Sequence, residues 1–354
     1  MKDRLTDANF PRTADNRVYH LGIRPGEIAN RIVTVGSPSR ALVIASHLDD
    51  IPRKFRLESE RGFQTITGRY KGVPVSIISI GMGSPNMDFF VRETRESIAG
   101  DMAIIRLGSC GSLSHTAPVG SCVVPIQCVG VTRNVDFDFG NPEDQQEDKA
   151  YFISKPVPDD PELHQLVIKA LENARPPEDQ TPIVGDLVNA SADSFYSSQG
   201  RLTSFPDHNG HLIEELLQNV ESLGTLEMET FHLYHLAKCW NRRLPSSSTG
   251  VDLSHPGPPL TTGPVQPVTL PGGTPLSQST ATGSALVTLA DSRIHVSAAQ
   301  MVFAARTSAN RDFITPEKVK LIEEWTGKGV LEALITYNIP SERLHPEEGS
   351  VWAT

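Results

Sequence analysis

Three short glycine-containing segments follow expected strands, and two of them also carry an arginine that could bind an anion. They are Gly36-Ser37-Pro38-Ser39-Arg40, Gly81-Met82-Gly83 and Arg106-Leu107-Gly108-Ser109-Cys110-Gly111. Ligands of open α/β sheets lie beyond the carboxyl ends of the strands, where glycine lets the backbone approach closely. Because arginine adds planar, paired donors that suit phosphate, Arg40 and Arg106 are candidate phosphate ligands. No segment matches a complete dinucleotide-binding or P-loop motif, and glycine at a strand end often serves only a turn.

A second group of polar side chains lies between residues 193 and 201. Phe195 offers a flat stacking face, Gln199 an amide that both donates and accepts, and Arg201 a fork of donors. Together they could recognise a heterocycle that carries alternating carbonyl and N–H groups. The alternative interpretation is a polar surface loop.

A third group is Glu227-Met228-Glu229, at the start of an expected helix. Carboxylates near a helix N-terminus commonly interact only with the helix dipole. A carboxylate that accepts hydrogen bonds from two vicinal hydroxyls is also the usual way to hold a ribose, and both interpretations remain open at this point.

The elements that must position these residues alternate between strands and helices. Apolar and β-branched runs predict strands at residues 32–36, 63–70, 73–80, 102–108, 121–131, 182–190 and 294–305. Helical spacing of apolar residues predicts helices at 41–48, 86–98, 161–174, 214–220 and 229–240. Thr315-Pro316-Glu317 predicts the start of a last long helix. This alternation is typical of an α/β domain.

The composition excludes several classes of protein. The 354 residues include 42 acidic and 32 basic side chains, a formal net charge of −10, which argues against a broadly basic surface for nucleic acid. No apolar run is long enough to cross a bilayer, so we expect a cytoplasmic protein without a membrane partner. The four cysteines have neither disulfide-framework nor zinc-ligand spacing, and we expect no metal.

Residues 244–292 differ in composition from the rest of the expected single domain (residues 1–354). They contain eight Pro, six Gly and sixteen Ser or Thr, with two Asp and no Lys or Arg. Such a segment buries too little apolar surface to offset its chain entropy, so we predict a disordered insertion. It could be an inert linker or lie over a binding pocket. Residues 339–354 form a C-terminal extension to which the sequence assigns no function.

The order and spacing of five motifs resemble the nucleoside phosphorylase-I family, and within it the uridine phosphorylase branch of eukaryotic and fungal type. The motifs are Tyr19-His20-Leu21-Gly22, Gly36-Ser37-Pro38-Ser39-Arg40, Arg106-Leu107-Gly108-Ser109, residues 195–201 and Glu227-Met228-Glu229. The resemblance covers residues 18 to 240 and resumes from 294 to about 338. It implies a three-layer α/β/α sandwich with a mixed central β-sheet. The Phe-x3-Gln-x-Arg spacing at 195–201 is the feature that selects the uridine branch over purine relatives.

The resemblance also implies a role for each matching residue. Phosphate would be bound by Gly36, Arg40, Arg61, Arg106 and Ser109. Ribose would be bound by His20, Met228 and Glu229, and the base by Phe195, Gln199, Arg201 and Arg306. His20 and Arg61 would reach across from a neighbouring subunit, so the family implies self-association as a dimer or hexamer with shared sites.

The implied reaction is the phosphorolysis of uridine to uracil and ribose 1-phosphate. The ribosyl unit becomes cationic and the base anionic as the glycosidic bond breaks, so catalysis requires electrostatic complementarity. Arg106, Glu229 and Arg201 are the candidate catalytic residues. The implied substrates are a nucleoside and inorganic phosphate, and no organic cofactor is needed.

Several residues depart from the family pattern. Ser37 replaces the Asp of many bacterial members, and Gly62 stands where bacterial enzymes have a Glu that binds a monovalent cation, so a potassium site is not expected. Ala304-Ala305-Arg306-Thr307 replaces the Ser-Asp pair of purine enzymes. A phosphorylase of purine or other pyrimidine nucleosides remains an alternative, as does a non-catalytic nucleoside-binding or storage protein of the same fold.

Overall fold

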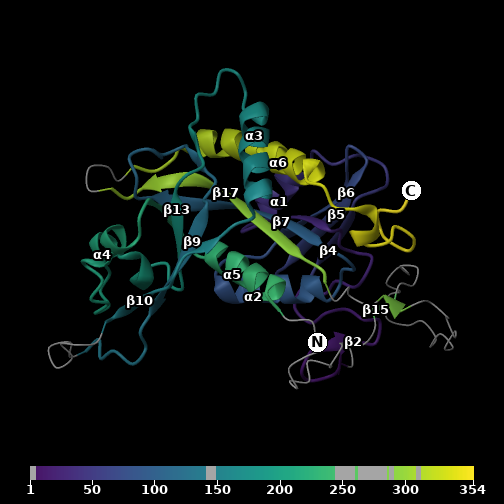
Figure 1. The fold of residues 1–354 in the computed structure, drawn as a ribbon, viewed down its shortest axis with the longest axis horizontal. Coiled ribbons are helices and arrows are strands. Elements are labelled where there is room, and N and C mark those ends of the chain that lie inside the picture. Colours follow the sequence, from purple (N-terminus) through teal and green to yellow (C-terminus); the bar gives the residue numbers. More distant parts are fainter. Residues whose placement is uncertain (1–4, 141–148, 244–259, 262–284, 287–290, 308–311) are drawn as a thin grey trace.

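The computed structural model describes residues 5–140, 149–243, 260–261, 285–286, 291–307 and 312–354. A mixed β-sheet forms the middle of the molecule, and helices cover both of its faces (Figure 1). No helix among these residues combines the length and the apolar character needed to cross a bilayer.

The main path of the sheet has the strand order β10-β9-β13-β14-β7-β3-β6-β5-β4. Its strands are β3 (Arg31–Val35), β4 (Phe55–Glu58), β5 (Gln64–Tyr70), β6 (Val73–Ser79), β7 (Met102–Ser112), β9 (Gln127–Arg133), β10 (Tyr151–Ile153), β13 (Val188–Ala192) and β14 (Leu223–Glu227). The long strand β17 (Ile294–Ala305) pairs in parallel with β7 along its whole length. Because β3 is parallel to β6 and β7 whereas β14 is antiparallel to β7, the sheet is mixed.

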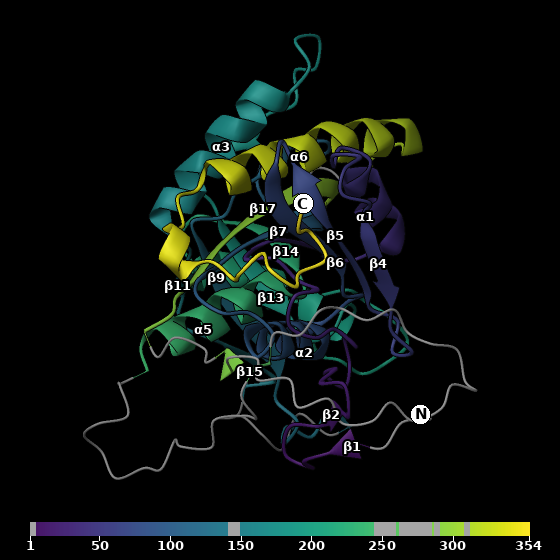
Figure 2. The same cartoon turned by 90° about the vertical axis from the view of Figure 1, so that its right-hand side faces the viewer.

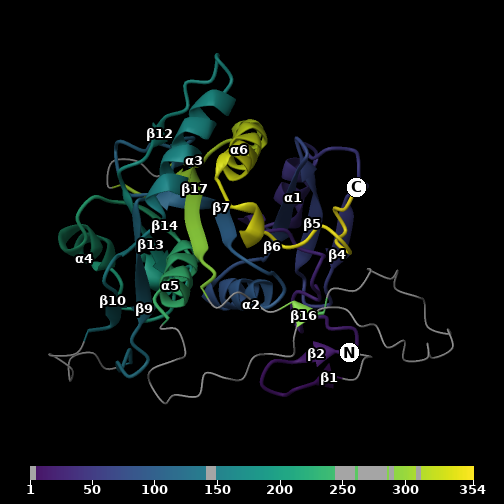
Figure 3. The ribbon, with the colours of Figure 1, turned by 45° about the vertical axis from the view of Figure 1, so that its right-hand side comes forward.

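Two groups of helices form the outer layers. Helices α1 (Pro38–Ala45), α3 (Pro161–Ala174) and α6 (Pro316–Thr336) pack on one face, and α2 (Ser84–Arg95) and α5 (Thr230–Asn241) on the other (Figure 3). Helix α4 (Leu212–Asn219) packs beside β9 and β13 at one end of the sheet. The three-layer α/β/α sandwich predicted from the resemblance is confirmed.

Some strand predictions are wrong in their bounds. The expected strand at 121–131 is two strands, β8 (Cys122–Val123) and β9, with Pro125 between them, which has no N–H for a ladder. The expected strand at 182–190 likewise divides into β12 (Ile183–Val184) and β13. The short strands β4, β10 and β11 (Val157–Pro158) were not predicted.

Small two-stranded sheets lie outside this layer. Strands β1 (Leu5–Thr6) and β2 (Arg12–Thr13) pair near the N-terminus, and β15 (Leu260–Thr261) pairs with β16 (Ala285–Leu286). Of the insertion predicted at 244–292, only residues 260–261, 285–286 and 291–292 belong to the described residues. Its two ends meet on the core, because Trp240 Nε1 donates to the backbone oxygen of Ser292 over 2.9 Å.

The C-terminal extension packs against the core rather than projecting from it. It contains the short 3-10 helix η3 (Ser341–Arg343) and then crosses the molecule beside β5 (Figure 2). Trp352 is 1% exposed, and its backbone oxygen accepts a hydrogen bond from Arg69 Nε over 2.9 Å. His345 is also buried. Its ring Nδ1 accepts from the backbone N–H of Ala99 over 3.0 Å, and its backbone N–H donates to Asn30 Oδ1 over 2.8 Å.

Docking of the extension should depend on pH through His345. Burial lowers the pKa of His345 to about 4, and nearby Arg95 adds to the effect. The unfolded chain therefore takes up this proton below pH 6.5 while the folded chain does not, so stability is complete at neutral pH and is lost as the pH falls towards 4. We expect His345 to account for about 2 kcal/mol of the decrease in unfolding free energy between pH 7 and pH 5.

The measurement is urea denaturation of wild type and His345→Asn at both pH values. Asparagine keeps an acceptor near the Nδ1 position and cannot be protonated. The pH-dependent loss should be smaller in the variant by that amount. Identical losses in both proteins would exclude His345 as the titrating group.

Candidate active site

The glycine-rich segments meet at one end of the sheet, as expected for parallel strands. Val35 at the end of β3 pairs with Ser79 of β6 on one side and with Leu107 of β7 on the other. Gly36 and Gly81 therefore follow β3 and β6 at the same edge as Gly108, which lies within β7 because this strand continues to Ser112 beyond its predicted end. A cavity of about 470 Å³ opens there.

The wall of this cavity contains most of the predicted site residues. It is lined by Gly36, Ser37, Arg40, Gly81, Met82, Arg106, Ser109, Cys110, Gly111, Phe195, Gln199, Arg201, Leu226, Glu227, Met228, Glu229, Phe303, Ala304 and Phe313. A larger cavity of about 750 Å³, beside β9, β10 and α4, is lined by none of the predicted site residues. The cavity at the strand ends is therefore the candidate active site.

Two buried arginines form one side of the cavity. Arg40 lies in the first turn of α1. Ser37 caps the N-terminus of this helix, because its hydroxyl oxygen accepts from the Arg40 backbone N–H over 3.3 Å. Burial lowers the pKa of Arg40, a shift that its hydrogen bond to Glu323 opposes and the nearby Arg106 charge reinforces. Arg106 is 3% exposed, and its Nε and Nη1 have no hydrogen-bond partner within the described chain. Two adjacent buried cations with unused donors are suited to an anion.

Glu229 connects β7 to the N-terminus of α2. Its Oε1 accepts a hydrogen bond from the Gly83 N–H over 2.6 Å, and its Oε2 accepts one from Arg106 Nη2. Burial raises the pKa of Glu229, the charge of Arg106 opposes this shift, and the neighbouring Glu227 reinforces it. This carboxylate lines the same cavity as the two arginines.

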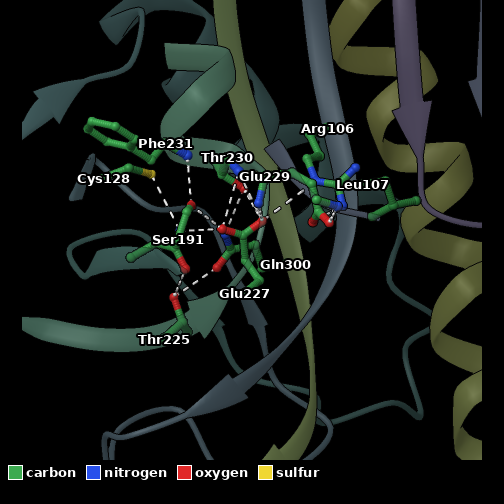
Figure 4. A network of polar contacts seen from close by, with 12 residues as sticks. Arg106, Leu107, Cys128, Ser191, Thr225, Glu227, Glu229, Thr230, Phe231 and Gln300 are labelled. Carbon is green, nitrogen blue, oxygen red and sulfur yellow. Dashed lines mark hydrogen bonds and ion pairs between the residues drawn. The ribbon is translucent and has the colours of Figure 1, made fainter. Parts of the chain in front are cut away.

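Glu227, in contrast, is saturated by hydrogen bonds from the protein itself (Figure 4). Its carboxylate accepts from Asn189, Ser191, the N–H groups of Glu229 and Thr230, and the Thr230 hydroxyl. Because these donors include the first N–H groups of α5, Glu227 satisfies the helix N-terminus and fixes the turn that carries Glu229. The geometry assigns Glu227 a structural role that its position in the motif did not distinguish from that of Glu229.

The cavity wall also includes the amide and the arginine predicted to bind the base. Gln199 lies in the 3-10 helix η2 (Ser197–Gln199), and its Oε1 accepts from Arg201 Nη1. The Arg201 guanidinium lies 3.8 Å from the centre of the Phe195 ring. Burial, together with the nearby charge of Arg306, lowers the pKa of Arg201 to about 10. One face of Phe195 is therefore occupied by Arg201.

Three predicted residues do not line the cavity. Arg61 is exposed and lies over the Tyr19 ring at 4.9 Å, while His20 Nδ1 lies 2.7 Å from Glu93 Oε1. Their contribution to a neighbouring subunit's site stays a prediction. Arg306 lies just behind the wall, with its Cδ 3.1 Å from the point where a Cβ on Gly111 would be and its Nη2 donating to the Gly200 backbone oxygen over 3.4 Å.

Sequence reasoning missed several apolar residues of the wall, notably Met82, Cys110, Phe303 and Phe313. Phe303 lies at an irregularity in the pairing of β17 with β7, between Val302 and Ala304. Cys110 is buried in β7, and burial raises the pKa of its thiol, which keeps it neutral. Only Met82 and Cys110, which lie within glycine-containing segments already singled out, had a signal in the sequence.

Comparison with known proteins identifies the family. A model of the phosphorylase superfamily matches residues 30–246. The chain belongs to the phosphorylase superfamily. This superfamily membership covers the segments that carry Arg40, Arg106, Gln199, Arg201 and Glu229, so the resemblance derived from the motifs is confirmed.

Relatives within the phosphorylase superfamily include enzymes named for different nucleosides. A uridine phosphorylase of Thermococcus kodakarensis is 28% identical over 247 residues, which cover 69% of this chain and 80% of that protein. A DeoD-type purine nucleoside phosphorylase of Oceanobacillus iheyensis is 29% identical over 234 residues, covering 66% and 86%.

A solved structure from a study of two uridine phosphorylases of the oomycete Phytophthora capsici has a TM-score of 0.74 and 34% identity. The superposition of the two structures covers 95% of this chain and 100% of the Phytophthora chain. A Trypanosoma brucei nucleoside phosphorylase, with a TM-score of 0.65 and 20% identity, shares the fold.

The structural role of Glu227 can be tested by Glu227→Gln. Glutamine would direct an NH₂ group at donors that now meet a carboxylate oxygen, leaving buried donors unsatisfied. We expect a loss of about 2 to 4 kcal/mol in unfolding free energy, measured by urea denaturation. Glu221→Gln, at an exposed site just before β14, is the matched control and should leave stability unchanged. Equal stability of the two variants would contradict the assigned role.

Proposed function

We propose that the protein is a nucleoside phosphorylase that converts uridine and phosphate to uracil and ribose 1-phosphate. The observation that carries this proposal is one cavity whose wall combines two buried arginines, a buried carboxylate and an amide–arginine pair. These three groups match the phosphate, the ribose and the base in chemistry. The uridine phosphorylases among the relatives support the same substrate.

The reaction couples formation of a C–O bond to cleavage of the C–N glycosidic bond. A phosphate oxygen attacks the anomeric carbon, and the electron pair of the breaking bond leaves with the base. Arg40, Arg106 and Ser109 would hold the phosphate beside the sugar, with the Gly36 backbone at the same edge. Holding both reactants in this geometry can supply up to about 7 to 11 kcal/mol of the barrier decrease.

Glu229 would hold the ribose by accepting hydrogen bonds from its hydroxyls, beside Met228. Its ion pair with Arg106 favours the ionised form, which accepts without donating. A fixed negative charge next to the sugar also stabilises the cationic ribosyl unit that develops as the bond lengthens. The same residue thus serves binding and catalysis in this proposal.

Gln199 and Arg201 would stabilise the departing uracil anion. The Gln199 amide donates one Nε2–H to the Glu227 backbone oxygen and accepts from Arg201, which leaves one N–H and one lone pair for the edge of a pyrimidine. Arg201 supplies a positive charge for the developing negative charge. Arg306 lies close enough for its charge to lower the pKa of Arg201, and it would add to the positive charge near the departing base. Electrostatic stabilisation of this kind requires no organic cofactor or metal.

His20 and Arg61 would complete the site of a second copy of the chain. Both lie outside the cavity of their own chain, and Arg61 is exposed. A dimer, or a hexamer built from dimers, would place them at the phosphate and ribose of the neighbouring site. Self-association is therefore part of the proposal, as is a cytoplasmic location.

Cleavage of purine nucleosides is the second candidate, because DeoD-type purine enzymes are similar to this chain at 29–30% identity. The Phe195, Gln199 and Arg201 group favours a pyrimidine instead. The segment Ala304-Ala305-Arg306-Thr307 replaces the Ser-Asp pair of purine enzymes. It contains no acid group for a purine nitrogen, and its Ala304 lines the cavity.

A side-by-side assay of uridine, thymidine and inosine tests the substrate. We expect release of uracil from uridine that requires inorganic phosphate, with slower release of the other bases. Liquid chromatography of the products, with and without phosphate, is the measurement. Faster cleavage of inosine would favour the purine candidate, and binding of all three without cleavage would favour the non-catalytic one.

The role of Arg201 can be tested by Arg201→Ala. Loss of a charge-assisted contact to the leaving base should decrease turnover of uridine by roughly tenfold or more. Arg133→Ala is a matched control, because Arg133 also lies 3.8 Å from a phenylalanine ring, that of Phe139, but does not line the cavity. Steady-state kinetics should show near-normal turnover for the control, and an equal rate for Arg201→Ala would remove Arg201 from the base site.

A further inference from the structure

Arg40 is anchored from outside the cavity by a residue of the last long helix. Its Nε–H donates to Oε1 of Glu323 in α6 over 2.8 Å, and its Nη1 donates to the Leu107 backbone oxygen over 3.4 Å. A guanidinium group has five N–H donors, so these two contacts leave donors on the terminal nitrogens. Because Arg40 also lines the cavity, those donors are available to a ligand there.

The packing of α6 against α1 sets this contact. One turn after Glu323, Gly327 lies so close to α1 that an added Cβ would be 3.0 Å from Cγ1 of Ile44. Ile44 in turn lies one helical turn after Arg40, so the two contacts follow each other at four-residue spacing on both helices. The side chains of Arg40 and Glu323 are largely buried at this contact, 8% and 17% exposed respectively. The position of the carboxylate is therefore fixed by the helix contact.

A second cation makes this anchor important. Arg40 and Arg106 are both buried and close enough for their charges to repel each other. Arg106 has Glu229 as its ion-pair partner, and Arg40 has Glu323. Each arginine thus has its own carboxylate, but only Glu229 lines the cavity.

We propose that Glu323 is a positioning residue for phosphate, which holds the Arg40 guanidinium by Nε so that its terminal N–H groups face the anion. The inference rests on the proposed function for the role of Arg40, and it extends the site to a helix beyond the family match, which ends at residue 246. Glu323 does not itself touch the ligand. Its contribution is the direction of the Arg40 donors and not an additional charge at the phosphate.

Two variants of Glu323, one that changes the length of the side chain and one that changes its charge, test this proposal. Glu323→Asp keeps the charge but is too short to hold Nε, whereas Glu323→Gln loses the charge but keeps the acceptor. Isothermal titration of inorganic phosphate should show binding about tenfold weaker for Glu323→Asp and within about threefold of wild type for Glu323→Gln. Glu324→Asp is the matched control, because Glu324 is the exposed neighbour on the same helix. It should bind phosphate like the wild type.

Kinetics add a second readout. Glu323→Asp should raise the KM for phosphate by a similar factor while leaving the KM for uridine within twofold, a split that general loss of structure would not give. Normal phosphate affinity of Glu323→Asp, or weaker binding by Glu323→Gln than by Glu323→Asp, would overturn the proposal. Phosphate binding with the expected pattern but no cleavage of uridine by wild type would support the role of Glu323 and refute the proposed reaction.

Discussion

A positive charge held away from water has to be compensated by the protein around it, and Arg106 is such a charge. Its compensation begins with Glu229, whose carboxylate also accepts from the backbone of Gly83. Glu229 is positioned by Glu227, which is held by the first N–H groups of α5 and by side chains of β13. The positions of several elements therefore depend on one buried guanidinium group.

This dependence explains why the site lies at the edge of the sheet and not within a loop. The parallel strands bring Gly36, Gly81 and Gly108 to the same edge of the sheet. The antiparallel strand β14 reaches this edge from the opposite direction and brings Glu227 and Glu229. A mixed sheet thus places basic and acidic groups in the same small cavity. The charges are fixed before any substrate arrives, which is the arrangement that electrostatic catalysis requires.

Features encoded by local pattern could be predicted from the sequence. Helix α3 and strand β17 were predicted with their observed bounds, because their apolar periodicity runs uninterrupted between clear start and stop signals. The division of 121–131 was missed because apolar residues on both sides of Pro125 hide the break. Most candidate site residues were found through their motifs. Contacts such as those of Arg106 with Glu229, 123 residues apart, depend on the folded topology and have no local signal.

The hydrogen bond between Trp240 and Ser292 joins the two points at which the chain leaves and re-enters the core. Because these points are already adjacent, the chain can leave and return here without displacing the elements of the core, and the entropy of closing a loop grows only slowly with its length. Mutations that lengthen or shorten this stretch would consequently be close to neutral for the core during evolution. This position is a natural place for the gain or loss of whole segments among related proteins.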